Sequence, residues 1–211
     1  MARVKEAMDE KTQSTHQRIL EAAVQVFASK GYHDTRVDEI VDVSQTSKGS
    51  IYFHFPSKED IFLALVDEFA ALLEKRLQRV LETETGGVRR VQAALQVCVE
   101  TFQSHRALAK IFLIQAVGLG EAFETRRQQI NEKFALIIQK HIDQAIAEGD
   151  IAPLDSETAA HVWIGALYDV MIHWVQTGHP RPEQMLPTLQ AMLLRSIGVS
   201  EERISRLDQE R

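Results

Sequence analysis

The chain has 211 residues and a formal net charge of −6, and 45% of its residues are hydrophobic and 26% are charged. This composition is typical of an ordinary soluble chain that buries a core, and it excludes the disordered and collagen-like classes. Its five prolines and ten glycines are few, and residues that favour helix are abundant, so we expect an all-α fold. The single cysteine, Cys98, excludes an internal disulfide.

The N-terminal segment is charged and polar and shows no leader of a secreted protein. No run of the chain approaches the ~18 uncharged apolar residues that a membrane span needs. We therefore expect a cytoplasmic protein without membrane contact. Residues 1–13 lack an apolar period and are expected to form a flexible arm. Helical periodicity starts at Ser14, and Gly31 lies where a left-handed residue is expected to end the helix.

Two short helices are predicted next. The pattern Thr35-x-x-Asp38 is typical of a capping box and opens the first of them. The polar segment 44–46 then interrupts the pattern, and a second short helix starts at Ser47. Two short helices around a tight break indicate a helix-turn-helix.

The remaining chain is predicted to be helical throughout. A second capping box, Ser57-x-x-Asp60, follows Pro56 and starts a long helix that extends to about Thr85. Apolar periodicity predicts further helices, the second of them interrupted, over residues 88–103, 106–120, 121–148, 156–176 and 182–196. The sequence therefore predicts about nine helices, an optional turn in the tail 199–211, and no sheet.

A helix-turn-helix binds DNA by placing its short second helix in the major groove, which is about 12 Å wide. Small and polar residues must lead that helix, and the segment 47–50 meets this need. Its backbone N–H groups face phosphate, Gly49 allows close approach, and Lys48 reaches a base or a phosphate. The segment is therefore a candidate DNA-reading element.

Aromatic and basic side chains follow this segment. Tyr52, His54 and Lys58 carry a phenol, an imidazole and an ammonium, which suit phosphate oxygens. The alternative role for the aromatic residues is a small hydrophobic core. We expect that role for Phe53 and Phe55.

This N-terminal region resembles the TetR-type bacterial transcriptional regulators over about residues 14–70. The matching features, in chain order, are Gly31-Tyr32, Ile40, Ser47-Lys48-Gly49-Ser50-Ile51-Tyr52-Phe53-His54-Phe55 and Lys58-Glu59. The resemblance implies a DNA-binding surface formed by Arg36, Gln45, Thr46, Ser47, Lys48, Gly49, Ser50, Tyr52, His54 and Lys58.

The turn departs from the family pattern, because family members usually carry Ala-Gly-Val where this chain has 44–46 as Ser-Gln-Thr. If this turn needs a positive φ, Gln45 adopts it at a cost of about 1 kcal/mol. The charge of this region does not favour general binding to DNA, since residues 1–60 carry eight basic and ten acidic side chains. Binding to DNA must therefore rest on a local patch that dimerisation doubles.

The resemblance divides the chain into an arm (1–13), a helix-turn-helix domain (14–60), a helical ligand-binding and dimerisation domain (61–198) and a tail (199–211). It implies a repressor that a ligand releases from a palindromic operator, whose half-sites lie about 34 Å apart. The segment 163–175 is apolar around most of its helical circumference, which indicates a second burial partner. The candidate residues of a homodimer interface are Val162, Ala166, Val170, Trp174, Leu189, Met192 and Leu193.

A small hydrophobic effector is the implied ligand, and no cofactor is implied. The candidate pocket residues, for which plain core packing is the alternative, are Phe112, Phe123, Arg126, Phe134, Ile138, Trp163, Leu167 and Met171. Segments 124–132 and 165–174 more distantly resemble regulators of fatty-acid degradation that respond to acyl-CoA, with Arg126 or Arg127 available to a phosphate.

Other functions find less support in the sequence. His161, Asp169 and His173 share one side of a helix as a weak metal candidate, with buried hydrogen bonding as the alternative. No histidine has a glutamate three residues before it, and phosphate-loop and nucleophile-elbow motifs are missing, so we expect no enzyme. An all-α ligand-binding or adaptor protein whose helix-turn-helix has lost DNA binding stays as the alternative.

Overall fold

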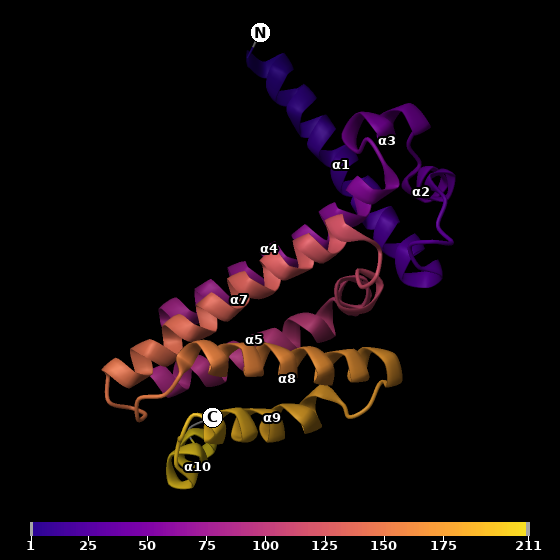
Figure 1. The fold of residues 1–211 in the computed structure, drawn as a ribbon. Helices are drawn as coiled ribbons and strands as arrows, with labels where there is room; N and C mark the ends of the chain where they lie inside the picture. Colours follow the sequence, from indigo (N-terminus) through magenta and orange to yellow (C-terminus); the bar gives the residue numbers. More distant parts are fainter. Residues whose placement is uncertain (1, 210–211) are drawn as a thin grey trace. The chain divides into compact units, whose positions relative to one another are not determined.

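The computed structural model describes the backbone of residues 2–209 and the side chains of residues 14–206. All regular elements of this described backbone are helices, which confirms the all-α prediction (Figure 1). In chain order they are α1 (Ala2–Lys30), α2 (Val37–Ser44), α3 (Lys48–His54), α4 (Lys58–Thr83), α5 (Gly87–Ser104), α6 (Arg106–Lys110), the π-helical turn η1 (Ile111–Gln115), α7 (Glu121–Ala147), α8 (Ser156–Thr177), α9 (Pro182–Ser196) and α10 (Glu201–Gln209). The interrupted helix is α6 with η1, and the tail forms α10.

The helices form two compact units. The first consists of the chain up to Phe69 together with Ala107–Phe123, and the second consists of Ala70–Arg106 together with the chain from Glu124 onward. The helix-turn-helix lies in the first unit, and helices α8 and α9 lie in the second. None of the described helices is long and apolar enough to cross a membrane.

Helix α1 is longer than the sequence pattern indicates. It begins at Ala2, so the predicted start at Ser14 is wrong. The segment 2–13 is rich in Ala, Arg, Lys, Glu and Met, which favour helix without needing an apolar stripe. Further along, the periodic residue Phe27 is fully buried, and Gly31 ends the helix with a φ of 86°, as predicted.

The two predicted capping boxes have different outcomes. At α4 the prediction is confirmed, because Ser57 Oγ accepts the N–H of Asp60 at 3.1 Å. At α2 the predicted cap is wrong. Thr35 Oγ1 donates to the Gly31 carbonyl at 2.7 Å, and α2 instead begins after Arg36. The carboxylate of Glu39, the third residue of α2, accepts the Arg36 N–H at 3.0 Å and so completes the cap at Arg36.

The segment Ala107–Phe123 closes the C-terminal end of α1 within the first unit. Lys110 Nζ donates to the Ala28 carbonyl at 2.7 Å, and Gln115 Nε2 donates to the Phe27 carbonyl at 2.9 Å. The last carbonyls of a helix lack helical partners, so Lys110 gives the Ala28 carbonyl a donor, and Gln115 adds a second donor to the Phe27 carbonyl, which already accepts the Gly31 N–H at 2.8 Å. The helix-turn-helix is thus supported by residues far along the chain.

The second unit has its own hydrophobic core. Its members are Val88, Val91, Leu95, Ile142, Ala145, Ile151, Trp163, Leu189, Leu193, Leu194, Ile197, Val199 and Ile204. They come from α5, α7, α8, α9 and α10 and from the connecting loops. Helix α8 lies alongside α9 (Figure 1). Apolar residues on several helices therefore converge on one core, as expected for helix-on-helix packing.

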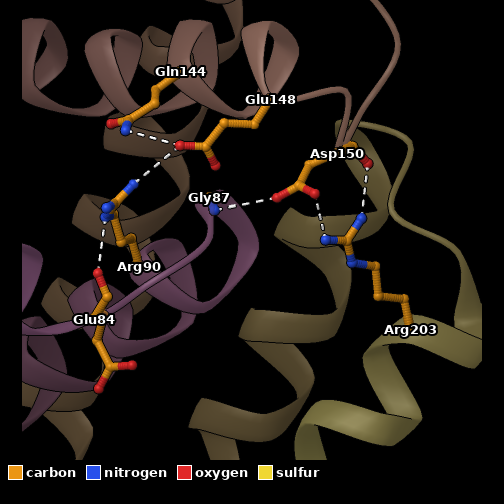
Figure 2. A network of polar contacts seen from close by, with 7 residues as sticks. All are labelled: Glu84, Gly87, Arg90, Gln144, Glu148, Asp150 and Arg203. Atoms are coloured by element: carbon orange, nitrogen blue, oxygen red, sulfur yellow. Dashed lines mark hydrogen bonds and ion pairs between the residues drawn. The ribbon is translucent and has the colours of Figure 1, made fainter.

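A polar network ties the ends of three helices together in this unit (Figure 2). The Asp150 carboxylate accepts the N–H of Gly87 at the start of α5 at 3.2 Å and pairs with Arg203 of α10 at 2.6 Å. Arg90 lies 3.5 Å from Glu148 at the end of α7. Because Asp150 satisfies an unpaired N–H of α5 and neutralises Arg203, the C-terminal helix is anchored by charge as well as by packing.

Candidate functional site

The turn between α2 and α3 has a left-handed backbone. Gln45 has φ 52° and ψ 40°, and it is the only non-glycine with a positive φ among the described residues. Arg18 of α1 donates to the carbonyls of Ser44 at 2.6 Å and Gln45 at 3.1 Å. The hydroxyls of Ser44 and Thr46 lie 2.7 Å apart. The turn thus keeps the geometry that glycine would favour, and α1 holds it there.

Two cations flank one carboxylate beside this turn. Lys48 Nζ lies 2.7 Å from Asp38, and Arg36 Nη2 lies 3.6 Å from the same carboxylate. The hydrogen bond from Lys48 lowers the pKa of Asp38 and raises the pKa of Lys48. Both cations are largely exposed, with 57% and 79% of their side-chain surface accessible. Exposed ion pairs are weak, so a phosphate can replace Asp38 as the partner of Lys48.

The aromatic residues of α3 are divided between core and surface. Phe55 is buried, as predicted, next to the fully buried Ile51. The prediction for Phe53 is wrong, because its side chain is 79% exposed. Phe53 follows Ile51 by two residues, which places it on the opposite side of a helix that buries Ile51. Tyr52 is 44% exposed on the solvent side as well.

We call the exposed set Arg36, Lys48, Tyr52 and Phe53 the reading surface. Spacing within a helix of seven residues does not reveal which side is buried, which is why sequence reasoning missed Phe53.

The remaining residues at the start of α3 shape its first turn. Ser47 Oγ accepts the Ser50 N–H at 3.1 Å, so this hydroxyl caps the helix. A Cβ at Gly49 would meet only Ser47 Oγ, at 4.0 Å, and Gly49 is exposed. The first turn therefore leaves open space beside Gly49, and contact of this segment with a DNA backbone stays a prediction.

Lys58 lies in a different environment from the one its predicted role requires. Its ammonium donates to the carbonyls of Tyr32 at 2.7 Å and Thr35 at 2.9 Å, and it lies 4.4 Å from the centre of the Tyr32 ring. Burial raises the pKa of that tyrosine. In the structure Lys58 therefore binds the loop between α1 and α2, and it is not part of the reading surface.

His54 lies at the end of α3 against α1. Its ring centre is 5.8 Å from that of His16, edge to face. Burial, together with the charge of His16, lowers the pKa of His54. The lowered pKa favours the neutral imidazole of His54, in which one ring nitrogen is a donor.

The predicted pocket residues are divided between the two units, and in each they take part in core packing. In the first unit Phe112 packs on Phe69, with 5.3 Å between ring centres, and Phe123 packs on Phe62 at 5.5 Å. In the second unit the buried or partly buried members are Phe134, Ile138, Trp163, Leu167 and Met171. Their role as pocket walls stays a prediction.

The two arginines named for an acidic effector group differ in exposure and in their hydrogen-bond partners. Arg127 makes two hydrogen bonds to the Glu124 carboxylate, at 2.6 and 3.0 Å. Arg126 is exposed and donates to the neutral amide of Gln129 at 3.1 Å. Both arginines therefore lie on the first turns of α7 as candidates for an acidic effector group, and Arg126 is the more exposed of the two.

The predicted dimer residues fall into three groups by exposure. Val162 and Met192 are 56% and 60% exposed, which is high for large apolar side chains. Ala166 and Val170 are half-buried. Trp174, Leu189 and Leu193 are buried in their own chain, the two leucines within the core of the second unit. Direct contact with a partner is therefore open to Val162 and Met192 and closed to the two leucines.

The weak metal candidate is not assembled. Among the described side chains, no group of three or more His, Cys, Asp or Glu residues is arranged to hold a metal ion. His161 Nε2 lies 3.9 Å from Glu132, while Asp169 and His173 are exposed on α8. The three residues share a helix side without converging on one point.

Comparison with known proteins agrees with this geometry. Residues 19–65 match the model of the family described as bacterial regulatory proteins, tetR family. The transcriptional repressor DhaR of Mycobacterium sp. (strain GP1) is 27% identical over 88% of this chain and 96% of its own length. FadR from Bacillus halodurans has a TM-score of 0.78 at 18% identity, covering 88% of this chain and 97% of that one. FadR from Bacillus subtilis, solved with stearoyl-CoA, has a TM-score of 0.76 at 19% identity, covering 88% and 99%.

A helix-turn-helix with an exposed, cationic and aromatic second helix, joined to a larger helical unit, defines a DNA-binding transcriptional regulator. The helix-turn-helix region, residues 19–65, matches the tetR family of bacterial regulatory proteins, and most of the chain is similar to the repressor DhaR.

Proposed function

We propose that this protein is a homodimeric repressor that binds a palindromic operator and is released from it by a small hydrophobic ligand. The exposed reading surface carries the proposal, since Phe53 and Tyr52 are apolar or aromatic groups left in solvent beside two cations. A purely structural adaptor has no need for such a surface. Sequence-specific DNA binding uses all four side chains.

Each side chain of the reading surface has a defined task on DNA. Lys48 exchanges Asp38 for a phosphate or a guanine edge, and Arg36 binds the phosphate backbone. The Tyr52 hydroxyl donates to a phosphate oxygen. Phe53 has no hydrogen-bonding group, so its ring packs on a thymine methyl or a sugar. The phosphate contacts of Lys48, Arg36 and Tyr52 supply affinity, and base-edge contacts of Phe53 and Lys48 add sequence preference.

Dimerisation is required because one reading surface is small. Residues 1–60 carry more acidic than basic side chains, so a single copy has little general attraction for DNA. A two-fold dimer presents two identical surfaces, and half-sites about 34 Å apart read successive major grooves on one face of DNA. The exposed Val162 on α8 and Met192 on α9 are the apolar residues that we assign to the dimer contact.

An acyl-CoA is the effector class that we propose. FadR from Bacillus subtilis, whose fold this chain shares, was solved with stearoyl-CoA. In this chain Arg126 is the candidate partner of the effector's phosphates. A ligand of this kind releases DNA only if it binds the DNA-free arrangement better than the DNA-bound one.

Selection of binding sites from random duplex DNA, at stated salt, tests the DNA-binding proposal. Wild-type protein is expected to enrich a palindrome, and the Lys48→Ala/Tyr52→Ala variant is expected to lose it. Lys140→Ala removes an exposed cation of α7 and serves as the matched control. Equal enrichment by the double variant contradicts the reading surface. No enrichment by folded wild type, refolded to remove any bound ligand, contradicts DNA binding itself.

Release of the selected operator tests the effector class. Stearoyl-CoA is expected to dissociate the complex, whereas stearate and free CoA are not, because each lacks half of the required contacts. Arg126→Ala is expected to raise the concentration of stearoyl-CoA needed for release. A complex that resists acyl-CoAs of every chain length contradicts this effector class and leaves the DNA-binding proposal standing.

A further inference from the structure

A glycine lies in the middle of α8, where helices disfavour it. Gly165 is exposed, it does not need a positive φ, and a Cβ built on it would meet no atom within 4 Å. The described structure of a single chain therefore gives no steric reason for glycine at this position. A missing side chain on an exposed helix side is useful when another backbone approaches closely.

Opposite chemical groups flank Gly165 symmetrically. His161 lies one turn before it and Asp169 one turn after it, and both are exposed. Among the described side chains Asp169 has no hydrogen-bond or ion-pair partner, and His161 has only the distant Glu132 at 3.9 Å. The apolar Val162, 56% exposed, lies on the same side of the helix. An antiparallel copy of this side of α8 would therefore place a histidine opposite a carboxylate at both ends of the contact.

We infer that α8 of a second copy crosses α8 antiparallel at Gly165, so that His161 of each copy faces Asp169 of the other. The inference rests on the proposed homodimer and specifies its register. A two-fold axis perpendicular to two identical helices makes them antiparallel, and the residue on the axis then faces itself. Residues four positions before the axis face residues four positions after it. The axis at Gly165 forms the histidine–carboxylate contact twice.

A second copy fits this surface better than an unrelated partner. The surface offers one donor and one acceptor at equal distances from a glycine, which is the arrangement that an isologous contact requires. Two glycines on the axis let the backbones approach, and the flanking Val162 and the Met192 of α9 add apolar surface. His161 and Asp169, two of the three residues of the weak metal candidate, thus contribute to the proposed dimer contact.

Charge reversal in the full-length protein tests the register by sedimentation equilibrium. His161→Glu sets two carboxylates against each other and is expected to raise the dimer dissociation constant at least tenfold. The double variant His161→Glu/Asp169→Arg restores opposite charges and is expected to return that constant to within about threefold of wild type. The introduced carboxylate at position 161 also lies near Glu132 of the same chain, and repulsion between these two groups could weaken the dimer indirectly. Such repulsion cannot explain the rescue, because residue 169 lies two helical turns from residue 161 of its own chain. Asp143→Arg, on the exposed side of α7, is the control.

Crosslinking gives an independent test. Gly165→Cys is expected to form a covalent dimer under mild oxidation, because only residues on the axis bring identical Cα atoms within the ~7 Å that a disulfide allows. Asp143→Cys is expected to stay uncrosslinked. An unchanged dimer dissociation constant for His161→Glu, or a Gly165→Cys variant that forms no covalent dimer, overturns this register while the proposed dimer stands. A wild-type protein that is monomeric at all concentrations overturns the dimer itself, and the inference with it.

Discussion

Two residues show how a single position can depart from its expected role. Gln45 occupies a left-handed turn that suits glycine, and the carbonyls around it are held by Arg18. Lys58 matches a family motif position expected to contact phosphate, yet its ammonium binds loop carbonyls. Residue identity alone predicted both positions as parts of the DNA interface. Backbone conformation and hydrogen-bond partners assign them structural tasks as well.

Replacing Gln45 by glycine is expected to stabilise the protein. The left-handed conformation costs a residue with a side chain about 1–2 kcal/mol, and glycine removes this strain. Glycine also increases the conformational entropy of the unfolded chain, which offsets part of the stabilisation. The expected net change in the free energy of unfolding is about +0.5 to +1 kcal/mol, measured by urea denaturation. Gln45→Ala keeps the strain and is the control. A glycine variant no more stable than the alanine variant contradicts strain at this turn.

Replacing Lys58 by methionine is expected to destabilise the first unit. The carbonyls of Tyr32 and Thr35 then lose a charged donor, and the expected loss is about 1–3 kcal/mol. Urea denaturation of the variant measures this loss. Lys140→Met, on exposed α7, should be nearly neutral. An equally stable Lys58→Met variant shows that the loop does not depend on this ammonium.

At the scale of elements, periodicity and capping signals located the helices, while contacts between helices set their ends. The cap at Ser57 followed the sequence pattern, whereas the cap at Thr35 did not, because Gly31 accepted the Thr35 hydroxyl. The point where two helices approach closely was harder to find from the sequence than the caps, because a single glycine marks it. A Cβ at Gly87 would lie 2.6 Å from the Ala145 Cβ, so α5 and α7 meet at a point where only glycine fits.

Gly87→Ala is therefore expected to destabilise the second unit, even though alanine favours helix. The new methyl group would also lie 2.9 Å from the Ala145 Cα, so the backbone must move, at an expected cost of about 1–3 kcal/mol. Gly49→Ala, where the methyl group meets open space, is expected to be neutral or stabilising in the same thermal and urea unfolding experiments. Equal effects at both positions would contradict the close helix contact.

At the scale of the whole molecule, net charge and local charge act in opposite directions. The chain carries a formal charge of −6, so we expect its affinity for DNA to come from the few cations of the reading surface, doubled by two-fold symmetry. The affinity should therefore depend steeply on salt, because each phosphate contact releases counterions. Loss of one cation per copy then removes two phosphate contacts from a dimer.

Lys48→Ala is accordingly expected to make the slope of log K against log salt shallower by about 2, since each contact contributes ~0.9. Fluorescence anisotropy with the selected operator at several salt concentrations measures the slope. Lys58→Ala should leave the slope unchanged, because its ammonium is bound within the chain. A slope change for Lys58→Ala as large as for Lys48→Ala would return Lys58 to the DNA interface.

The sequence by itself determined the helical class and nearly all helix positions, and it located the candidate DNA-reading segment, because periodicity, caps and motif spacing are local properties. The tertiary structure decided which side of each helix is buried. It exposed Phe53, buried Leu189 and Leu193 in their own core, and directed Lys58 to a loop. Burial and hydrogen-bond partners depend on residues far apart in the chain, and a single sequence does not state which of them meet.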